Sequence, residues 1–135
     1  MDPVSRDRRS QTGARPSRLE AVERALVYSR AHAGAPVPIS RLCRVVGLSE
    51  RSLRNAFHRV HGTSPKQCLL AERLREARRA LSETADRPTT VTDVATRFGF
   101  YELGRFAVTY RKVFGERPSD TLRGASRRSQ ANTHH

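Results

Sequence analysis

Apolar residues recur at steps of three and four along most of the chain, and no alternating apolar and polar pattern is sustained. This periodicity is typical of amphipathic helices and argues against strands. Seven helices are predicted: the first begins at about residue 18, and the others lie at about 38–46, 50–61, 65–82, 91–98, 102–114 and 118–123. The fold class that this pattern predicts is all-α.

Helix start signals support these positions. Ser17 with Glu20 forms a capping-box pattern, Thr90 with Asp93 forms a second, and Ser49 and Ser64 stand where N-caps are needed. Each helix carries one apolar stripe that can face a core, and the predicted inward residues include the following: Leu19, Val22 and Leu26; Ile39, Leu42 and Val46; Leu53, Phe57 and Val60; Leu74, Ala77 and Leu81; Val94 and Phe98; Phe106 and Tyr110.

The chain contains an internal repeat. In "ISRLCRVVGLSERSLRNAFHRVHGTSP" and in "VTDVATRFGFYELGRFAVTYRKVFGERP" a short helix ends at a glycine, and a second helix ends in Gly-x-x-Pro. The second helices are offset by 53 residues, as from Phe57 to Tyr110, and the first helices by 52, as from Gly47 to Gly99. Two helices joined by a short turn are typical of the helix-turn-helix unit, whose second helix lies in the DNA major groove.

Charge favours the same interpretation. Lys and Arg outnumber Asp and Glu 26 to 13, which gives a formal net charge of +13 and indicates a polyanionic partner such as nucleic acid. No apolar run approaches the roughly 18 residues of a membrane span and no signal peptide is recognisable, so we expect no membrane partner and a cytoplasmic, nucleoid-associated protein.

Chemistry of other kinds finds little support. Cys43 and Cys68 lie within helical patterns, without the paired spacing of a zinc site, and a disulfide framework is not expected. No phosphate-binding glycine loop, nucleophile elbow or paired carboxylates stand out, so neither an enzyme nor a cofactor is predicted.

The second repeat and the upstream stretch "LSERSLRNAFHRVHGTSPKQCLLAERLREARRAL" resemble the C-terminal DNA-binding domain of the AraC/XylS family of bacterial transcription regulators. The resemblance covers about residues 18–123. It implies two helix-turn-helix subdomains, at 18–63 and 84–123, joined by a linker helix at 64–83. Residues 1–17 and 124–135 lack apolar periodicity, so we expect flexible tails there. A linker of 18 residues would span roughly 27 Å, close to the roughly 34 Å between successive major-groove faces.

Many members of this family carry an N-terminal domain that binds an effector or dimerises. Such a domain is not recognisable in this sequence, so we expect either a stand-alone form or a part of a longer regulator, with the effector domain as a separate partner. The resemblance also implies contact with RNA polymerase beside promoter DNA, because family members most often activate transcription.

The helix at about 50–61 offers base-reading chemistry. With Leu53 and Phe57 inward, its outward face carries Arg51, Arg54, Asn55 and His58. Arg can donate to guanine O6 and N7, and Asn can pair with adenine N6 and N7. The resemblance places base contacts at Arg51, Arg54 and Asn55, and a phosphate contact at His58; the alternative is an ordinary solvated face.

The corresponding face of the helix at about 102–114 is nearly apolar and consists of Leu103, Gly104, Ala107 and Val108. It can meet thymine methyl groups and allow close backbone approach, but it offers almost no hydrogen-bonded readout. Several family members have polar residues at Ala107 and Val108. The alternative is that Leu103 and Val108 contact another protein.

Phosphate contacts are expected around both units, from Arg105, Arg111, Lys112 and Arg117, and from the helix N-termini at Ser64–Lys66 and Arg117–Ser119. Simple helix capping is the alternative at the two N-termini. The function that these features predict is a sequence-specific DNA-binding transcription regulator, and the resemblance implies an activator. The alternative is a basic helical module that binds nucleic acid non-specifically or mainly binds protein.

Overall fold

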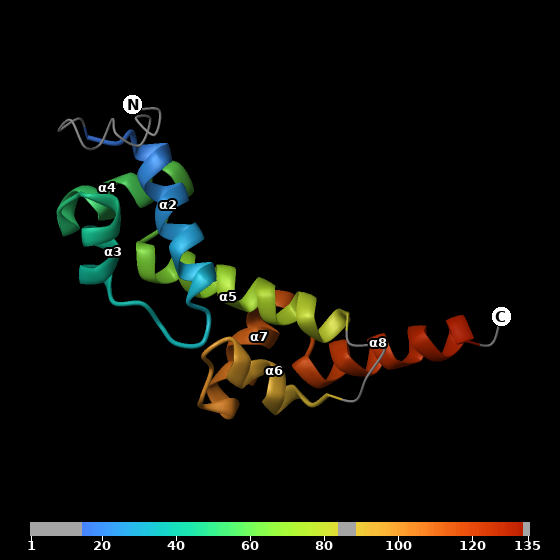
Figure 1. Cartoon of the computed structure of the whole chain (residues 1–135). Coiled ribbons are helices and arrows are strands. Elements are labelled where there is room, and N and C mark those ends of the chain that lie inside the picture. The colour runs from blue at the N-terminus through green and yellow to red at the C-terminus, as the bar shows by residue number, and fades with distance from the viewer. Residues whose placement is uncertain (1–14, 84–88, 134–135) are drawn as a thin grey trace. The chain divides into compact units, whose positions relative to one another are not determined.

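The computed structural model describes residues 15–83 and 89–133, and every regular element within these ranges is a helix (Figure 1). These elements are α2 (Arg18–Ala31), α3 (Ile39–Val46), α4 (Glu50–His61), α5 (Pro65–Ser82), α6 (Val91–Arg97), α7 (Leu103–Phe114) and α8 (Pro118–Thr133). The all-α class and the seven predicted helices are confirmed. The expectations for residues 1–14, 84–88 and 134–135 lie outside the described residues.

The predicted helix starts are confirmed by their hydrogen bonds. Ser17 and Glu20 form a reciprocal capping box at α2, and Thr90 and Asp93 form another at α6. The Ser49 hydroxyl accepts the backbone N–H of Ser52, which begins α4. These caps satisfy N–H groups that have no partner within the helix, so side chains local in sequence fix where the elements begin.

The chain forms two compact units. Among the described residues, unit 1 comprises 15–32 and 37–70, and unit 2 comprises 33–36, 71–83 and 89–133. Each unit therefore contains one helix-turn-helix pair, α3 with α4 in unit 1 and α6 with α7 in unit 2.

The core of unit 1 lies where α2 packs against α3 and α4. Leu53 and Phe57 of α4 are fully buried, and Val22 and Leu42 meet them from the other two helices. The predicted phase of α4 is thus confirmed. The prediction for Leu19 is wrong, because its side chain is 58% exposed and Ala21, Val22 and Ala25 form the buried face instead.

The core of unit 2 is built around aromatic side chains of α7. The Phe106 ring lies 4.7 Å from that of Phe100 and 5.6 Å from that of Tyr110, centroid to centroid. The Tyr110 hydroxyl and the Thr121 hydroxyl of α8 are 2.7 Å apart and form a buried hydrogen bond. The hydrogen bond holds α7 against α8, and the ring contacts hold α7 against the turn that carries Phe100, so the direction of the opposite face of α7 is fixed.

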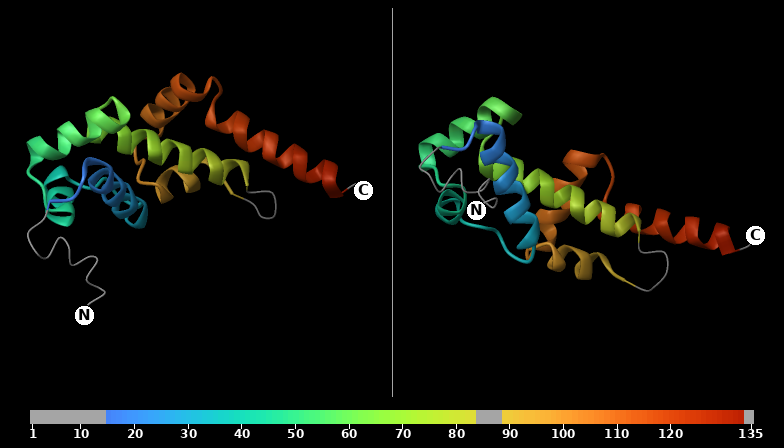
Figure 2. Two further views of the ribbon diagram at one scale, coloured as in Figure 1. Left: turned by 90° about the horizontal axis from the view of Figure 1, so that it is seen from above. Right: turned by 45° about the horizontal axis from the view of Figure 1, so that its top comes forward.

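The end of the chain differs from the prediction. A last helix ending at Arg123 and a flexible tail from 124 were expected, but α8 is helical to Thr133 and is an unbroken rod in both orientations of Figure 2. Its stretch beyond Arg123 contains no proline, and Ala125 is buried against unit 2. Burial on one side supplies stabilisation that the polar composition does not suggest.

The turn between α6 and α7 is closed by residues distant in sequence. Gly99 has φ of +85°, which only glycine adopts without strain. The Arg73 guanidinium of α5 donates to the Gly99 carbonyl over 3.3 Å and lies 5.0 Å from the centre of the Phe100 ring. The Tyr101 hydroxyl donates to the carbonyl of Gly34, so the 33–36 segment also belongs to the support of this turn.

Candidate nucleic-acid interface

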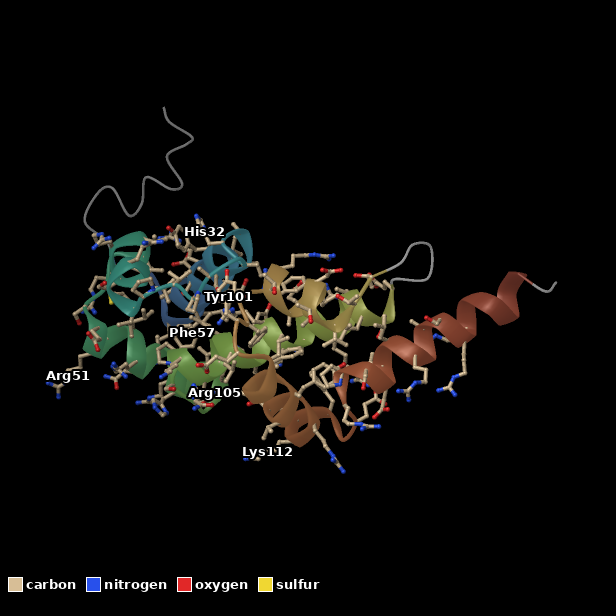
Figure 3. The ribbon with its side chains drawn as sticks, turned by 90° about the horizontal axis from the view of Figure 1, so that it is seen from below. His32, Arg51, Phe57, Tyr101, Arg105 and Lys112 are labelled. Carbon is tan, nitrogen blue, oxygen red and sulfur yellow. The ribbon has the colours of Figure 1, made fainter. Side chains whose placement is uncertain are left out.

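The outer face of α4 carries the polar residues that the sequence singled out. Leu53, Ala56 and Phe57 face the core, which leaves Arg51, Arg54, Asn55 and His58 exposed on one side. Arg51 extends away from the ribbon into open space, whereas Phe57 lies beneath α4 (Figure 3). The structure therefore brings the four predicted α4 residues together on a convex helix face that can enter a groove.

The Arg54 guanidinium is not free on this face. Its Nε donates to the Glu50 carboxylate over 3.2 Å, four residues earlier on the same helix. About half of each side chain is exposed, so the pair is weak and can open when a base edge competes for the guanidinium. Sequence reasoning did not identify Glu50, although the Glu-x-x-x-Arg spacing is a recognisable signal for such a pair.

A second contact that the sequence did not predict joins the start of the described chain to α4. The Arg15 guanidinium donates to the Ser52 hydroxyl over 2.9 Å. The contact brings the Arg15 cation to Ser52, which follows Arg51 in the sequence, and so places it beside the α4 face. Nothing in the spacing of Arg15 and Ser52, which are far apart along the chain, signals it.

The α7 face is exposed and apolar, as the sequence predicted. Val108 is 57% and Leu103 is 39% exposed, while Gly104 is exposed and Ala107 is half-buried. A Cβ added at Gly104 would meet no atom within 4 Å, so the surface over Gly104 is open to solvent. The four residues form one face in unit 2 that can make van der Waals contacts only.

Cations of α7 lie next to this apolar face. Arg105, Arg111 and Lys112 are all exposed, and Figure 3 shows Arg105 and Lys112 on α7. Arg105 pairs with Glu102 over 3.3 Å, and both side chains are largely exposed, which makes the pair easy to exchange for a phosphate. By helical spacing, Arg105 and Lys112 lie along one edge of the apolar face, and Arg111 follows Val108 toward the end of α7, so all three can bind a polyanion next to that face.

The two predicted anion-binding helix starts differ. At α5 the Ser64 hydroxyl accepts the Gln67 N–H, so Ser64 acts as a cap, and Lys66 is exposed beside it. At α8 the Asp120 carboxylate already accepts from the backbone N–H and the guanidinium of Arg117. Those hydrogen bonds hold the pKa of Asp120 at about 2. Ser119 next to it is half-buried.

Groups for other chemistry are sparse in the part of the chain that the structure describes. Cys43 and Cys68 form no disulfide bond, and burial raises the pKa of Cys43, with a further rise from the Glu50 carboxylate. No three His, Cys, Asp or Glu side chains of the described residues are grouped as a metal site would require. Of the described helices, none has the length and apolar character needed to cross a membrane.

Two helix-turn-helix units, each presenting the outer face of its second helix, define the class of protein: a bipartite helix-turn-helix module. A family model described as a helix-turn-helix domain matches residues 42–124. This range contains both units' helix pairs apart from the first residues of α3.

Similar proteins agree with this class. The chain is 37% identical over 101 residues to a XylDLEGF operon transcriptional activator of Pseudomonas putida, a match that covers 75% of this chain and 32% of that protein. It is 39% identical over 102 residues to a probable thc operon regulatory protein of Rhodococcus erythropolis, with 76% and 31% covered. The chain thus spans about a third of the length of these relatives.

Two solved structures are also similar. A probable AraC family transcriptional regulator from Rhodopseudomonas palustris matches with a TM-score of 0.69 and 41% identity, over 78% of this chain and 96% of that one. The DNA-binding domain of AdpA, solved in complex with a target DNA, has a TM-score of 0.68 at 21% identity, over 80% and 95%, and shares the fold. The chain belongs to the AraC/XylS family of helix-turn-helix regulators.

Proposed function

We propose that this protein binds double-stranded promoter DNA sequence-specifically and regulates transcription, with α4 and α7 inserted into adjacent major grooves. The observation that carries the proposal is the exposed Arg51, Arg54 and Asn55 face on the second helix of a helix-turn-helix unit. Arg and Asn are the side chains that discriminate guanine and adenine edges, and each good pair contributes roughly 1–3 kcal/mol of discrimination.

The two units have different tasks in this proposal. Unit 1 reads bases through the α4 face, with His58 on a phosphate. Unit 2 sets the register: Leu103, Gly104, Ala107 and Val108 lie against the base edges and offer contact to thymine methyl groups. The phosphate contacts of unit 2 and of the helix starts come from the remaining predicted residues, namely Ser64, Lys66, Arg105, Arg111, Lys112, Arg117 and Ser119. Phosphate contacts orient the protein but carry no sequence information.

Arg117 and Ser119 are the weakest members of this set. The Arg117 guanidinium makes two hydrogen bonds to Asp120, at 3.2 and 3.3 Å, so a phosphate must displace a carboxylate to reach it. Arg117 is exposed and Asp120 is partly buried, so this pair exchanges with a phosphate less readily than the more exposed pair of Arg105 with Glu102.

The regulatory role that we propose is activation. Relatives that match three quarters of the chain are named as operon activators, and RNA polymerase beside the promoter is the partner that such a role requires. The other partner is an N-terminal effector or dimerisation domain, on the same chain or a separate one. In this role the protein acts in the cytoplasm, at the nucleoid, and without a catalytic function.

A second candidate function is protein contact through unit 2. The side chains of Leu103 and Val108 are exposed and apolar. They can pack against a protein partner as readily as against thymine methyl groups. The two functions differ in their dependence on DNA sequence, because a module that binds mainly protein, or binds nucleic acid non-specifically, prefers no particular duplex.

Selection of bound sequences from a pool of random duplexes tests the proposal. The expected result is one asymmetric site of about two helical turns, preferred over random duplex by roughly 10³-fold or more. Affinity for that site should fall steeply between about 50 and 200 mM salt, with a slope near −0.9 per neutralised phosphate. A pool that yields no preferred sequence would favour the non-specific or protein-binding alternative.

A further inference from the structure

The helix α8 has an exposed basic side that no predicted contact uses. Arg123 and Arg127 are four residues apart, so they lie one above the other on the helix surface. Both are exposed. From Thr121 to Thr133 the sequence contains no Asp or Glu, and the carboxylate that α8 does carry, Asp120, lies in its first turn.

The opposite side of α8 is fastened to unit 2. Thr121 and Ala125 are buried, and the Arg128 guanidinium donates to the Ser82 carbonyl at the end of α5 over 3.4 Å. These three positions follow one another at helical spacing, so they hold three successive parts of one face. Arg123 and Arg127 each lie about half a turn away from Thr121 and Ala125, and therefore point outward from the core.

The basic side of α8 and the cations of α7 belong to the same compact unit. In Figure 3, side chains that end in nitrogen project from α8 toward the edge of the view to which Lys112 of α7 also points. Both helices belong to unit 2 and are joined by packing and by the buried bond from Tyr110 to Thr121. The outward arginines of α8 thus add to the positive charge that the α7 cations give unit 2.

From this arrangement we propose that Arg123 and Arg127 form a further phosphate-binding site, on the DNA backbone that flanks the base pairs next to unit 2. The inference rests on the proposed function. Four residues along a helix are about 6 Å, which is close to two nucleotide steps of about 3.4 Å each. The two side chains are therefore spaced to engage phosphates about two nucleotide steps apart on one strand.

The chemistry of this side favours DNA over an acidic protein. Its exposed described residues are Arg123, Ser126 and Arg127, without an exposed aromatic or aliphatic side chain. Protein interfaces require such side chains at their centre, whereas phosphate contacts need only cations and small polar groups. Arg123 shares the Asp120 carboxylate with Arg117 over 3.1 Å, an exposed pair that a phosphate can replace.

The test compares the wild-type chain with a variant carrying Arg123→Gln and Arg127→Gln, on the duplex selected from the random pool. Two lengths are used, one with about ten extra base pairs, roughly one helical turn, beyond each end of the site and one trimmed at the unit 2 end. A matched control carries Arg75→Gln and Arg79→Gln, which removes two exposed arginines at the same spacing from α5.

On the long duplex, removal of each phosphate contact should weaken binding by roughly 8-fold at about 0.1 M salt, because each neutralised phosphate adds about 0.9 to the salt slope. The preferred sequence should not change. On the trimmed duplex the affinity of the variant should be within about twofold of wild type, since the phosphates that the two arginines engage are then absent. The effect of the α5 control should not depend on duplex length. Gly124→Ala, which strengthens the helix between the two arginines, should preserve binding to the long duplex.

Equal loss of affinity on both duplexes would overturn the inference. It would mean that the two arginines act through general electrostatic attraction and not through contact with the flanking phosphates. Unchanged affinity and salt slope on the long duplex would also overturn it, and would leave an acidic protein as the partner of this side. Either result leaves the proposed function intact as long as wild type prefers its site. A wild-type chain without sequence preference would instead refute the proposed function itself.

Discussion

Replacement of Gly99 by alanine tests how the turn between α6 and α7 is held. Gly99 is buried, with φ of +85°. A Cβ at this position would lie 2.3 Å from Nη2 of Arg73, 3.1 Å from the carbonyl oxygen of Ala33 and 3.3 Å from Cα of Ala35. Two of these three atoms belong to backbone, which cannot move aside as a side chain can.

The expected cost is the sum of three effects. The left-handed backbone costs about 1–2 kcal/mol for any residue with a Cβ. Displacing Arg73 from the Gly99 carbonyl removes a hydrogen bond to a charged group, about 1.5–3 kcal/mol. Its contact with the Phe100 ring adds about 0.5–1 kcal/mol. Gly99→Ala should therefore lower the free energy of unfolding of unit 2 by about 3–6 kcal/mol, the total of these terms.

Gly115→Ala provides the matched control. Gly115 ends α7 with φ of +79°, but an added Cβ would meet no atom within 4 Å. Only the backbone cost of about 1–2 kcal/mol should remain. Amide hydrogen exchange at core residues of α7 in each variant reports the stability of unit 2 separately. If the two variants are destabilised equally, the close packing around Gly99 does not constrain the turn.

Three further predictions concern single side chains. Phe57→Ala should destabilise unit 1 by about 3–5 kcal/mol, since the ring is fully buried; an unchanged hydrogen-exchange stability there would show that the phase of α4 is wrong. Gly124→Ala should stabilise α8 by up to about 1 kcal/mol, because the added Cβ makes only an ordinary contact, 3.5 Å from Arg128; a lower melting temperature would contradict this. The Asp120 carboxyl should titrate with a pKa of about 2 in a ¹³C NMR titration, so the stabilisation from its hydrogen bonds with Arg117 is present above pH 3.8 and disappears as the pH falls through about 2. A pKa near 3.8 for Asp120 in the wild-type chain would refute this prediction, and Arg117→Gln should raise the pKa of Asp120 toward that value.

Local signals explain why most of the fold could be predicted. Capping residues such as Ser17 and Thr90 act within four residues of their partners, and the stripes that contain Phe57 and Phe106 are periodic, so both can be recognised in the sequence. The exposed α4 and α7 faces follow directly once those stripes face inward. Composition then indicates what kind of partner the faces meet.

Features that depend on tertiary contact could not be predicted. The length of α8 depends on burial of Ala125 and on the bond from Arg128 to Ser82, 46 residues earlier. Leu19 has the spacing of a core residue, but α2 packs through Ala21, Val22 and Ala25 instead. Val113 matches Val60 in the repeat, yet it is exposed near the end of α7, because a repeat transfers helix phase without transferring the neighbours.

The candidate site shows the same division. The position of Arg54 on the outer face followed from periodicity, and its pairing with Glu50 is local as well. The contact from Arg15 to Ser52 joins residues 37 positions apart and depends on how unit 1 packs around α2. Such contacts become visible only when the helices are assembled.

The central claim is that unit 1 reads bases and unit 2 mainly positions the protein. Binding titrations of Arg54→Ala, Val108→Ala and Arg111→Ala test it, each against the selected site and against every single base-pair change within it. Arg54→Ala should cost about 1–3 kcal/mol and relax the preference at one base pair. Arg111→Ala should weaken binding evenly across sequences and reduce the salt slope by about one.

Val108→Ala removes only apolar surface, a few tens of Å² at about 25 cal/mol per Å², and should cost less than about 1 kcal/mol. We expect the base preferences of this variant to remain those of wild type. Loss of preference over half of the site in Val108→Ala, with intact specificity in Arg54→Ala, would contradict this division of tasks and would make α7 the helix that reads the sequence.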